Sequence, residues 1–161
     1  MTRIQYLGYI MYEHGVHANP TKIQAIRDWS SLTTLTDLRN FLGLVNFYRR
    51  FMLGFSHIAW AIIQVTKGGG KDKFVWFESQ HKSFVKLKHH LCSAPVLSLP
   101  DLQQPFEIEI DASDYAVVAV LTQHGNLVAY HSERISDAIR KYDTYDMKMY
   151  SIVHDYRQWK H

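Results

Sequence analysis

The stretch FEIEIDASDY, residues 106–115, decides how the second half of this sequence folds. Apolar and acidic residues alternate in it from Phe106 to Asp111, which predicts a β-strand with one apolar and one acidic face. The small polar residues that follow end this strand. Asp111 therefore stands at a strand end, where its carboxylate could bind a metal ion or could simply serve the following turn.

Two further strands and a helix are expected after this strand. The apolar run AVVAVLTQ, residues 116–123, predicts the second strand. The string HGN, which contains Gly125, predicts a tight turn, and LVAYHSERI predicts the third strand. Three strands leave an unpaired edge, so marginal stability or aggregation is expected. Residues 142–161 predict a covering helix whose pattern runs to the last residue, which is typical of a fragment or a truncated gene. Its apolar face comprises Tyr142, Tyr145, Met149, Ile152, Tyr156 and Trp159.

The first half of the sequence predicts one hairpin and several helices. Residues 4–20 indicate a short hairpin with Gly15 in its turn, and Asn19 and Pro20 fit the N-cap and first position of a helix that reaches Trp29. Apolar residues at spacings of three and four predict a second helix over residues 35–52. This helix is expected to bury four aromatic residues, Phe41, Phe47, Tyr48 and Phe51.

Two more helices are expected on either side of a linker. The string SHIAWAIIQV predicts the first, and VWFESQHKSFVKLKHHL predicts the second, an amphipathic helix that buries Phe84, Leu87 and Leu91. The glycine-rich string KGGGKDK, residues 67–73, separates them. It lacks the spacing of a phosphate-binding loop, so it indicates a linker.

Composition limits the classes of protein that this chain can belong to. The chain has 161 residues, 47% of them hydrophobic, which is enough for a buried core. A net charge of +3 permits a nucleic-acid partner without indicating one. The single cysteine, Cys92, excludes an internal disulfide and suits an intracellular protein. No apolar run approaches the roughly 20 residues of a membrane helix, and the oligomeric state is left undecided.

Several strings, in one order along the chain, resemble the Pol polyprotein of gypsy-class LTR retrotransposons, from the end of its reverse transcriptase into its ribonuclease H domain. Residues 6–26, YLGYIMYEHGVHANPTKIQAI, resemble the primer-grip hairpin and the start of the thumb. LRNFLGLVNFYRRF resembles the rest of the thumb. Residues 74–101 resemble the segment that leads into the ribonuclease H domain. FEIEIDASDYAVVAVL and YDTYDMKMYSIV resemble the first two strands and the first helix of that domain.

The resemblance implies an α+β fold in two pieces. An N-terminal hairpin and a helical thumb-like part come first, and an incomplete ribonuclease H-like sheet of three antiparallel strands with a covering helix follows. The expected division is 1–19 for the end of the palm, 20–66 for the thumb-like region, 67–105 for the linker and lead-in helix, and 106–161 for a truncated ribonuclease H-like domain. The parent family copies RNA into DNA and cuts the RNA strand of the hybrid. No Tyr-x-Asp-Asp string of a polymerase site occurs here.

The resemblance also places a nuclease site. It implies that Asp111 is the first carboxylate ligand of a two-magnesium centre, and that a Glu in the first helix is the second. That Glu falls at position 148, where this sequence has Lys148. A cation there opposes the binding of two metal ions, and Lys148 is expected either to pair with Asp111 or to extend into solvent. Ala116 stands where the family usually has a glycine.

Three arginines are candidates for nucleic-acid contacts. Arg39, Arg49 and Arg50 fall outside the apolar stripe of the thumb-like helix, where they could contact phosphates of an RNA–DNA hybrid or duplex or could form an ordinary solvated face. The leading interpretation is a piece of a reverse transcriptase and ribonuclease H that is inactive alone. The alternatives are a non-catalytic nucleic-acid-binding module and a pseudogene product without function.

Overall fold

A computed structural model describes residues 3–67, 74–113 and 116–136, together with residues 139, 143, 145–146, 149–150, 152–153 and 159. Within this part the chain forms four α-helices, one 3₁₀ helix and two three-stranded antiparallel sheets, so the α+β class predicted from the sequence is confirmed. In chain order the elements are β1 (Ile4–Tyr6), β2 (Tyr9–Tyr12), β3 (Gly15–Ala18), α1 (Pro20–Arg27), α2 (Leu35–Phe47), η1 (Arg49–Phe51), α3 (Phe55–Lys67), α4 (Glu78–Cys92), β4 (Glu107–Ala112), β5 (Ala116–Gln123) and β6 (Asn126–Arg134).

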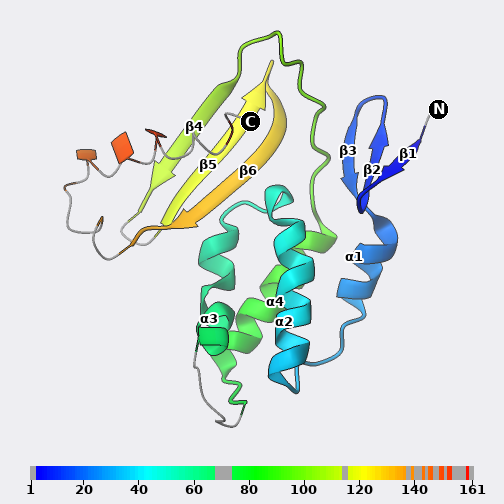
Figure 1. Ribbon diagram of the computed structural model, residues 1–161, viewed down its shortest axis with the longest axis vertical. Helices are drawn as coiled ribbons and strands as arrows, with labels where there is room; N and C mark the ends of the chain where they lie inside the picture. The colour runs from blue at the N-terminus through cyan, green and yellow to red at the C-terminus, as the bar shows by residue number, and fades with distance from the viewer. Residues whose placement is uncertain are drawn as a thin grey trace.

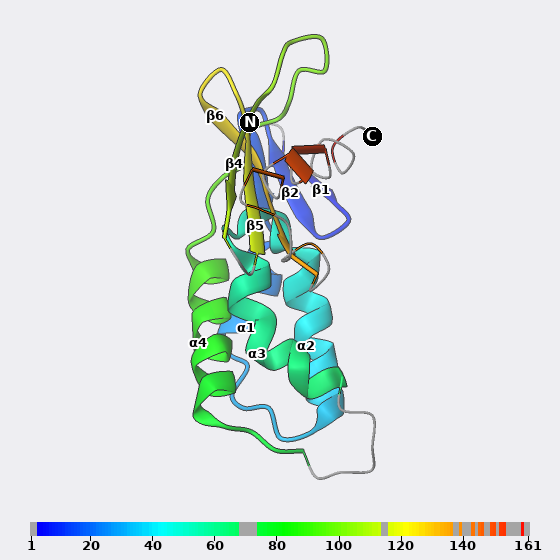
Figure 2. The same ribbon diagram turned by 90° about the vertical axis from the view of Figure 1, so that its left-hand side faces the viewer.

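The four helices pack around one another, and the sheets lie at one end of them (Figure 1). In Figure 1 the β4–β5–β6 sheet lies above the helices, and the small β1–β2–β3 sheet lies beside it, over α1. Figure 2 shows that the helices run side by side along the long axis. A single apolar core joins all four helices, with Phe41 at its centre in contact with the rings of Trp29 and Phe84 at 5.7 and 4.7 Å between centroids.

The helix starts follow from their capping residues. Asn19 caps α1 through its Oδ1, which accepts a hydrogen bond from the Thr21 amide at 2.9 Å, and Pro20 occupies the first helical position as predicted. Thr34 and Asp37 form a reciprocal capping box at the start of α2. These hydrogen bonds from Thr34, and from Thr33, hold the pKa of the Asp37 carboxyl below its ordinary value.

Two predictions about the first half need correction. The predicted hairpin is present as β2 and β3, but β1 adds a third strand through a turn at Leu7 and Gly8. The helix predicted over residues 35–52 ends at Phe47, and the chain continues as η1. At Tyr48 the backbone leaves the helical region, with φ −96° and ψ 11°, and the Tyr48 hydroxyl donates a hydrogen bond to the Gly8 carbonyl at 2.7 Å.

The break at Tyr48 also changes which aromatic residues are buried. Phe41, Tyr48 and Phe51 are in the core, but Phe47 is 42% exposed, so the prediction that it is buried was wrong. Tyr48 takes the inward position instead, and Phe47 stacks on the ring of Tyr9 with 4.8 Å between centroids. The predicted core residues of α4 are confirmed, because Phe84, Leu87 and Leu91 are buried.

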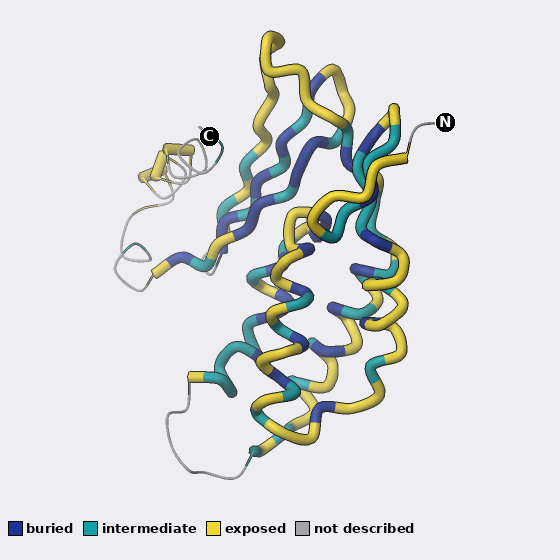
Figure 3. Tube along the Cα trace, turned by 45° about the vertical axis from the view of Figure 1, so that its right-hand side comes forward, coloured by how far each residue is buried: buried dark blue, intermediate teal, exposed yellow. Residues whose placement is uncertain are grey.

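The second sheet has the strand order β4–β5–β6, and β5 has the bounds predicted from the sequence. In the described part of the chain β4 pairs only with β5, which leaves its other side as an edge. Figure 3 shows that β4 is largely exposed while β5 is largely buried. Lys67, the first residue of the linker predicted over residues 67–73, is the last residue of α3, and residues 68–73 lie outside the described residues. Most of the predicted covering helix also lies outside them.

Four described residues bear on that covering helix. Trp159 packs against the cluster of Leu121, Val128 and Ala129, as expected for a residue that covers the sheet. Tyr145, Met149 and Ile152 were expected on the same apolar face but are exposed, because no described element covers them.

An extended segment ties the two sheets together. Leu97 and Val16 exchange both of their backbone hydrogen bonds, and the Ser98 amide donates to the carbonyl of Leu127 in β6 at 2.7 Å. Gly15 lies against this segment, since a Cβ atom at this position would be 2.6 Å from the Leu97 carbonyl oxygen. Only glycine fits there without movement of the backbone.

We expect Gly15→Ala to reduce the free energy of unfolding by about 1–3 kcal/mol, because the added Cβ atom must displace backbone. Urea unfolding followed by circular dichroism measures the change. Gly43→Ala is the matched control, since a Cβ atom there meets nothing within 4 Å. That control lies inside α2 and should stabilise the chain by up to about 1 kcal/mol. Equal effects of the two substitutions would contradict this role of Gly15.

Candidate nucleic-acid interface and nuclease position

Asp111 lies one residue before the end of β4, where its Cα pairs with that of Val118 in β5. The side chain is exposed, and it shares one face of the strand with Glu107 and Glu109. Successive side chains on this face stand about 6.8 Å apart along the strand. The predicted position at a strand end is therefore confirmed, with an acidic row leading up to it.

The described residues around Asp111 do not fit a two-metal centre. Such a centre needs several carboxylates around ions about 3.5–4 Å apart. Among the described residues, no three His, Cys, Asp or Glu side chains come close enough to hold a metal ion together. Lys148 lies outside the described residues, so its pairing with Asp111 stays a prediction.

Arg49 and Arg50 form the second candidate site. They lie on η1, which the break at Tyr48 places directly after α2, and both side chains are exposed. η1 packs against β6, and the two arginines line a cavity of about 280 Å³ between these elements. The cavity is also lined by Asn46, Phe47, Ala129, Tyr130, His131 and Trp159.

Aromatic rings surround the two arginines. Phe47 is exposed on the α2 side, Tyr130 lies on the β6 side, and the ring of Trp159 meets that of His131 edge to face at 5.9 Å. Burial raises the pKa of the Tyr9 hydroxyl, and the positive charge of Arg50 partly offsets this rise. No ion pair of Arg49 or Arg50 is present among the described residues, so their charges are available to an anionic ligand.

Arg39 does not belong to this group. It lies on the exposed side of α2, eight residues before the end of the helix, which corresponds to about 12 Å along the axis. The structure therefore brings together two of the three predicted arginines. Sequence reasoning missed Tyr130 and His131 as neighbours of this pair, because they lie about 80 residues further along the chain and no local pattern connects them.

A comparison with protein families decides the relationship. The sequence profile of the RNase H-like domain found in reverse transcriptase matches residues 76–161, just over half of the chain. The chain belongs to this family. The match covers α4 and the whole β4–β5–β6 sheet, so the resemblance inferred from the sequence is confirmed.

Relatives of this RNase H-like family member are retrotransposon polyproteins. The Pol polyprotein from transposon opus of Drosophila melanogaster is 30% identical over 94% of the chain, and that from transposon gypsy of the same organism is 31% identical over 93%. The Tf2-3 polyprotein of Schizosaccharomyces pombe is 30% identical over 99%. The chain spans only 16%, 16% and 12% of the length of these three relatives, respectively.

Solved structures with the same fold come from a foamy virus. Its protease–reverse transcriptase in complex with an RNA/DNA hybrid matches 97% of this chain and 22% of that chain, with a TM-score of 0.88 and 20% sequence identity. The foamy virus protease–reverse transcriptase dRH in complex with double-stranded DNA gives the same TM-score and identity, and matches 97% of this chain and 28% of that chain. At this identity the likeness establishes the fold of the family member. No helix in the described part of the chain is long and apolar enough to cross a membrane.

Proposed function

We propose that this chain binds RNA–DNA hybrid or duplex nucleic acid through Arg49 and Arg50 and does not cleave it alone. The observation that carries the proposal is the cavity between η1 and β6, where two exposed arginines without described ion pairs stand among aromatic rings. Guanidinium groups contact phosphates, and aromatic faces such as that of Phe47 can stack on bases. Arg39 adds a further positive charge on α2.

The relatives and the fold support the choice of ligand. The curated relatives are polyproteins of retrotransposons, and the foamy virus enzyme with the same fold was solved with an RNA/DNA hybrid. We infer that the chain contributes to reverse transcription and hybrid cleavage as part of a longer polyprotein. We also propose the division predicted from the sequence, with parts at 1–19, 20–66, 67–105 and 106–161. The two separate sheets support the first and last of these parts.

Arg49→Gln combined with Arg50→Gln should weaken binding to a 20-base-pair hybrid by about tenfold or more at 0.1 M salt, because two phosphate contacts are lost. The slope of log K against log salt should become shallower by about 1.8. Fluorescence anisotropy over a salt series measures both quantities. The control combines Lys22→Gln with Arg27→Gln, which removes the same charge from the exposed side of α1. An equal loss in the control would show that only net charge matters.

No cleavage of the hybrid is expected with magnesium, because Lys148 replaces the carboxylate that the family pattern places opposite Asp111. A gel assay with an active ribonuclease H as positive control measures the rate. Asp111→Asn should behave like the unchanged chain. A magnesium-dependent rate that Asp111→Asn abolishes would overturn the proposal.

We also propose that Lys148 pairs with Asp111. The motivation is that the family pattern brings these two positions to one site. A double-mutant cycle with Asp111→Asn and Lys148→Gln should show a coupling of about 0.2–1 kcal/mol in urea unfolding, the range of exposed ion pairs. The coupling should decrease when salt is added, since exposed charges are screened. Additive effects of the two substitutions would contradict the pair.

A further inference from the structure

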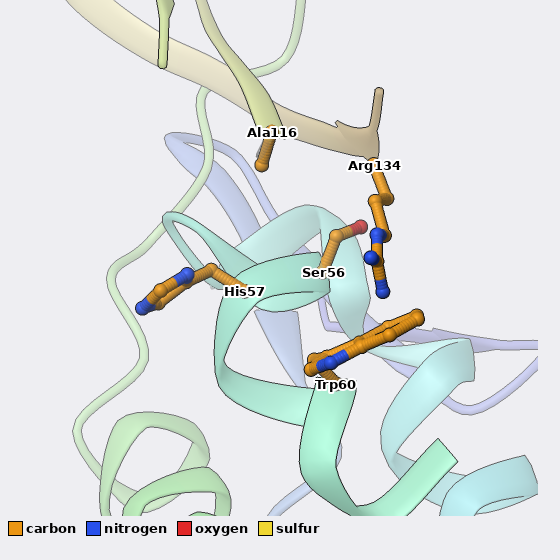
Figure 4. Close-up of a pocket in the computed structure, with 5 residues that line it drawn as sticks. All are labelled: Ser56, His57, Trp60, Ala116 and Arg134. Carbon is orange, nitrogen blue, oxygen red and sulfur yellow. The ribbon is translucent and has the colours of Figure 1, made fainter. Parts of the chain in front are cut away.

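A second cavity, of about 320 Å³, lies between the start of α3 and the strands β5 and β6. Figure 4 shows Ala116 and Arg134 on the sheet side, with Ser56, His57 and Trp60 of α3 on the opposite side. None of these described lining residues is acidic. The cavity is separate from the one that Arg49 and Arg50 line.

Arg134 is the charged group of this cavity, and one of its hydrogen-bond donors has no partner among the described residues. Its guanidinium carbon lies over the Trp60 ring, 3.0 Å from the ring centroid. Its Nη1 is buried and has no hydrogen-bond partner in the described part of the chain. A guanidinium cannot lose its proton, and a buried donor without an acceptor is costly. The position therefore calls for an anionic oxygen.

The surroundings of Arg134 are positive and preformed. The first turn of α3 contributes Ser56 and His57, so the positive end of this helix faces the cavity. The Ser56 amide donates to Ser132 Oγ at 2.9 Å, and Ser56 Oγ donates to the Ser132 carbonyl at 2.7 Å. These two bonds fix α3 against β6, so the walls of the cavity are in place before a ligand arrives.

We propose that this cavity binds a phosphate group, with Arg134 as the charged hydrogen-bond donor. The planar guanidinium matches two oxygens of a phosphate, and helix N-termini favour the same group. The volume is at the small end of ligand cavities, which are about 300–1,000 Å³, so the ligand is a phosphate with little attached to it or one phosphate of a nucleic-acid backbone. The site is additional to the interface at Arg49 and Arg50 and does not depend on it.

Thermal unfolding with inorganic phosphate tests the site, with sodium chloride keeping the ionic strength constant. A ligand that binds only the folded chain raises the Tm in proportion to its occupancy. Phosphate should raise the Tm of the unchanged chain, and Arg134→Gln should weaken the apparent affinity at least tenfold. Arg27→Gln, an exposed arginine on α1, should keep the full effect. Ala116→Leu fills the cavity from the residue that pairs with Arg134 across β5 and β6, and should abolish the effect with Arg134 intact.

Two further arms identify the source of the phosphate. If Arg134→Gln weakens the binding of inorganic phosphate but leaves the affinity for the hybrid unchanged, the ligand is a free phosphate. If the affinities for inorganic phosphate and for the hybrid both decrease, the ligand is a backbone phosphate. The affinity of Arg134→Gln for the hybrid is compared with that of the Arg49 and Arg50 variants. The phosphate site at Arg134 and the interface at Arg49 and Arg50 can therefore fail independently. The proposal is overturned if phosphate does not raise the Tm of the unchanged chain. It is also overturned if Arg134→Gln and Ala116→Leu respond to phosphate like the unchanged chain.

Discussion

The pairing of Leu97 with Val16 holds the two halves of this chain in one arrangement. The segment that contains Leu97 continues to Ser98, whose amide bonds to Leu127 of β6, so one extended strand of backbone touches both sheets. Leu97 itself is buried in the core of the helices. The position of the β4–β5–β6 sheet relative to the β1–β2–β3 sheet depends on this short ladder and on the absence of a side chain at Gly15, while the bonds between Ser56 and Ser132 hold β6 against α3.

The position of β6 gives the molecule its two cavities. One lies where η1 meets the middle of β6, and the other lies where α3 meets its end. Both bring arginines next to aromatic rings, Arg49 and Arg50 near Phe47 in the first cavity and Arg134 on Trp60 in the second. Positive charge is thus concentrated along the junction of helices and sheet, whereas the acidic residues of β4 lie on the outer strand.

Local patterns were sufficient to predict most elements of this fold. The spacing of Leu35, Leu38, Leu42 and Val45 indicated α2. The apolar run at 116–123 gave β5 its bounds, and Asn19 with Pro20 marked the start of α1. The break at Tyr48 was not predicted, because no local pattern marks it and the hydrogen bond that Tyr48 makes reaches Gly8, 40 residues earlier. The strand β1 was missed because its three residues are all exposed and show no alternation.

The sites were less predictable than the fold for the same reason. The resemblance to a polyprotein family identified Asp111, Arg49 and Arg50 as candidates, but which side chains surround them depends on long-range packing. The contact of Arg134 with Trp60 joins residues 74 positions apart in sequence, one on a strand and one on a helix. No periodicity within either element signals such a contact.

The outer face of β4 has a consequence for how copies of this chain meet. An unpaired strand edge can pair with a strand of another chain, and among the described residues β4 has such an edge. The exposed side chains of Glu107, Glu109 and Asp111 place negative charge along this strand. Two copies that approached edge to edge would bring these rows against each other, and the repulsion acts over roughly 8–10 Å at physiological ionic strength. The acidic row therefore opposes pairing between copies along β4, and this repulsion weakens as salt is added.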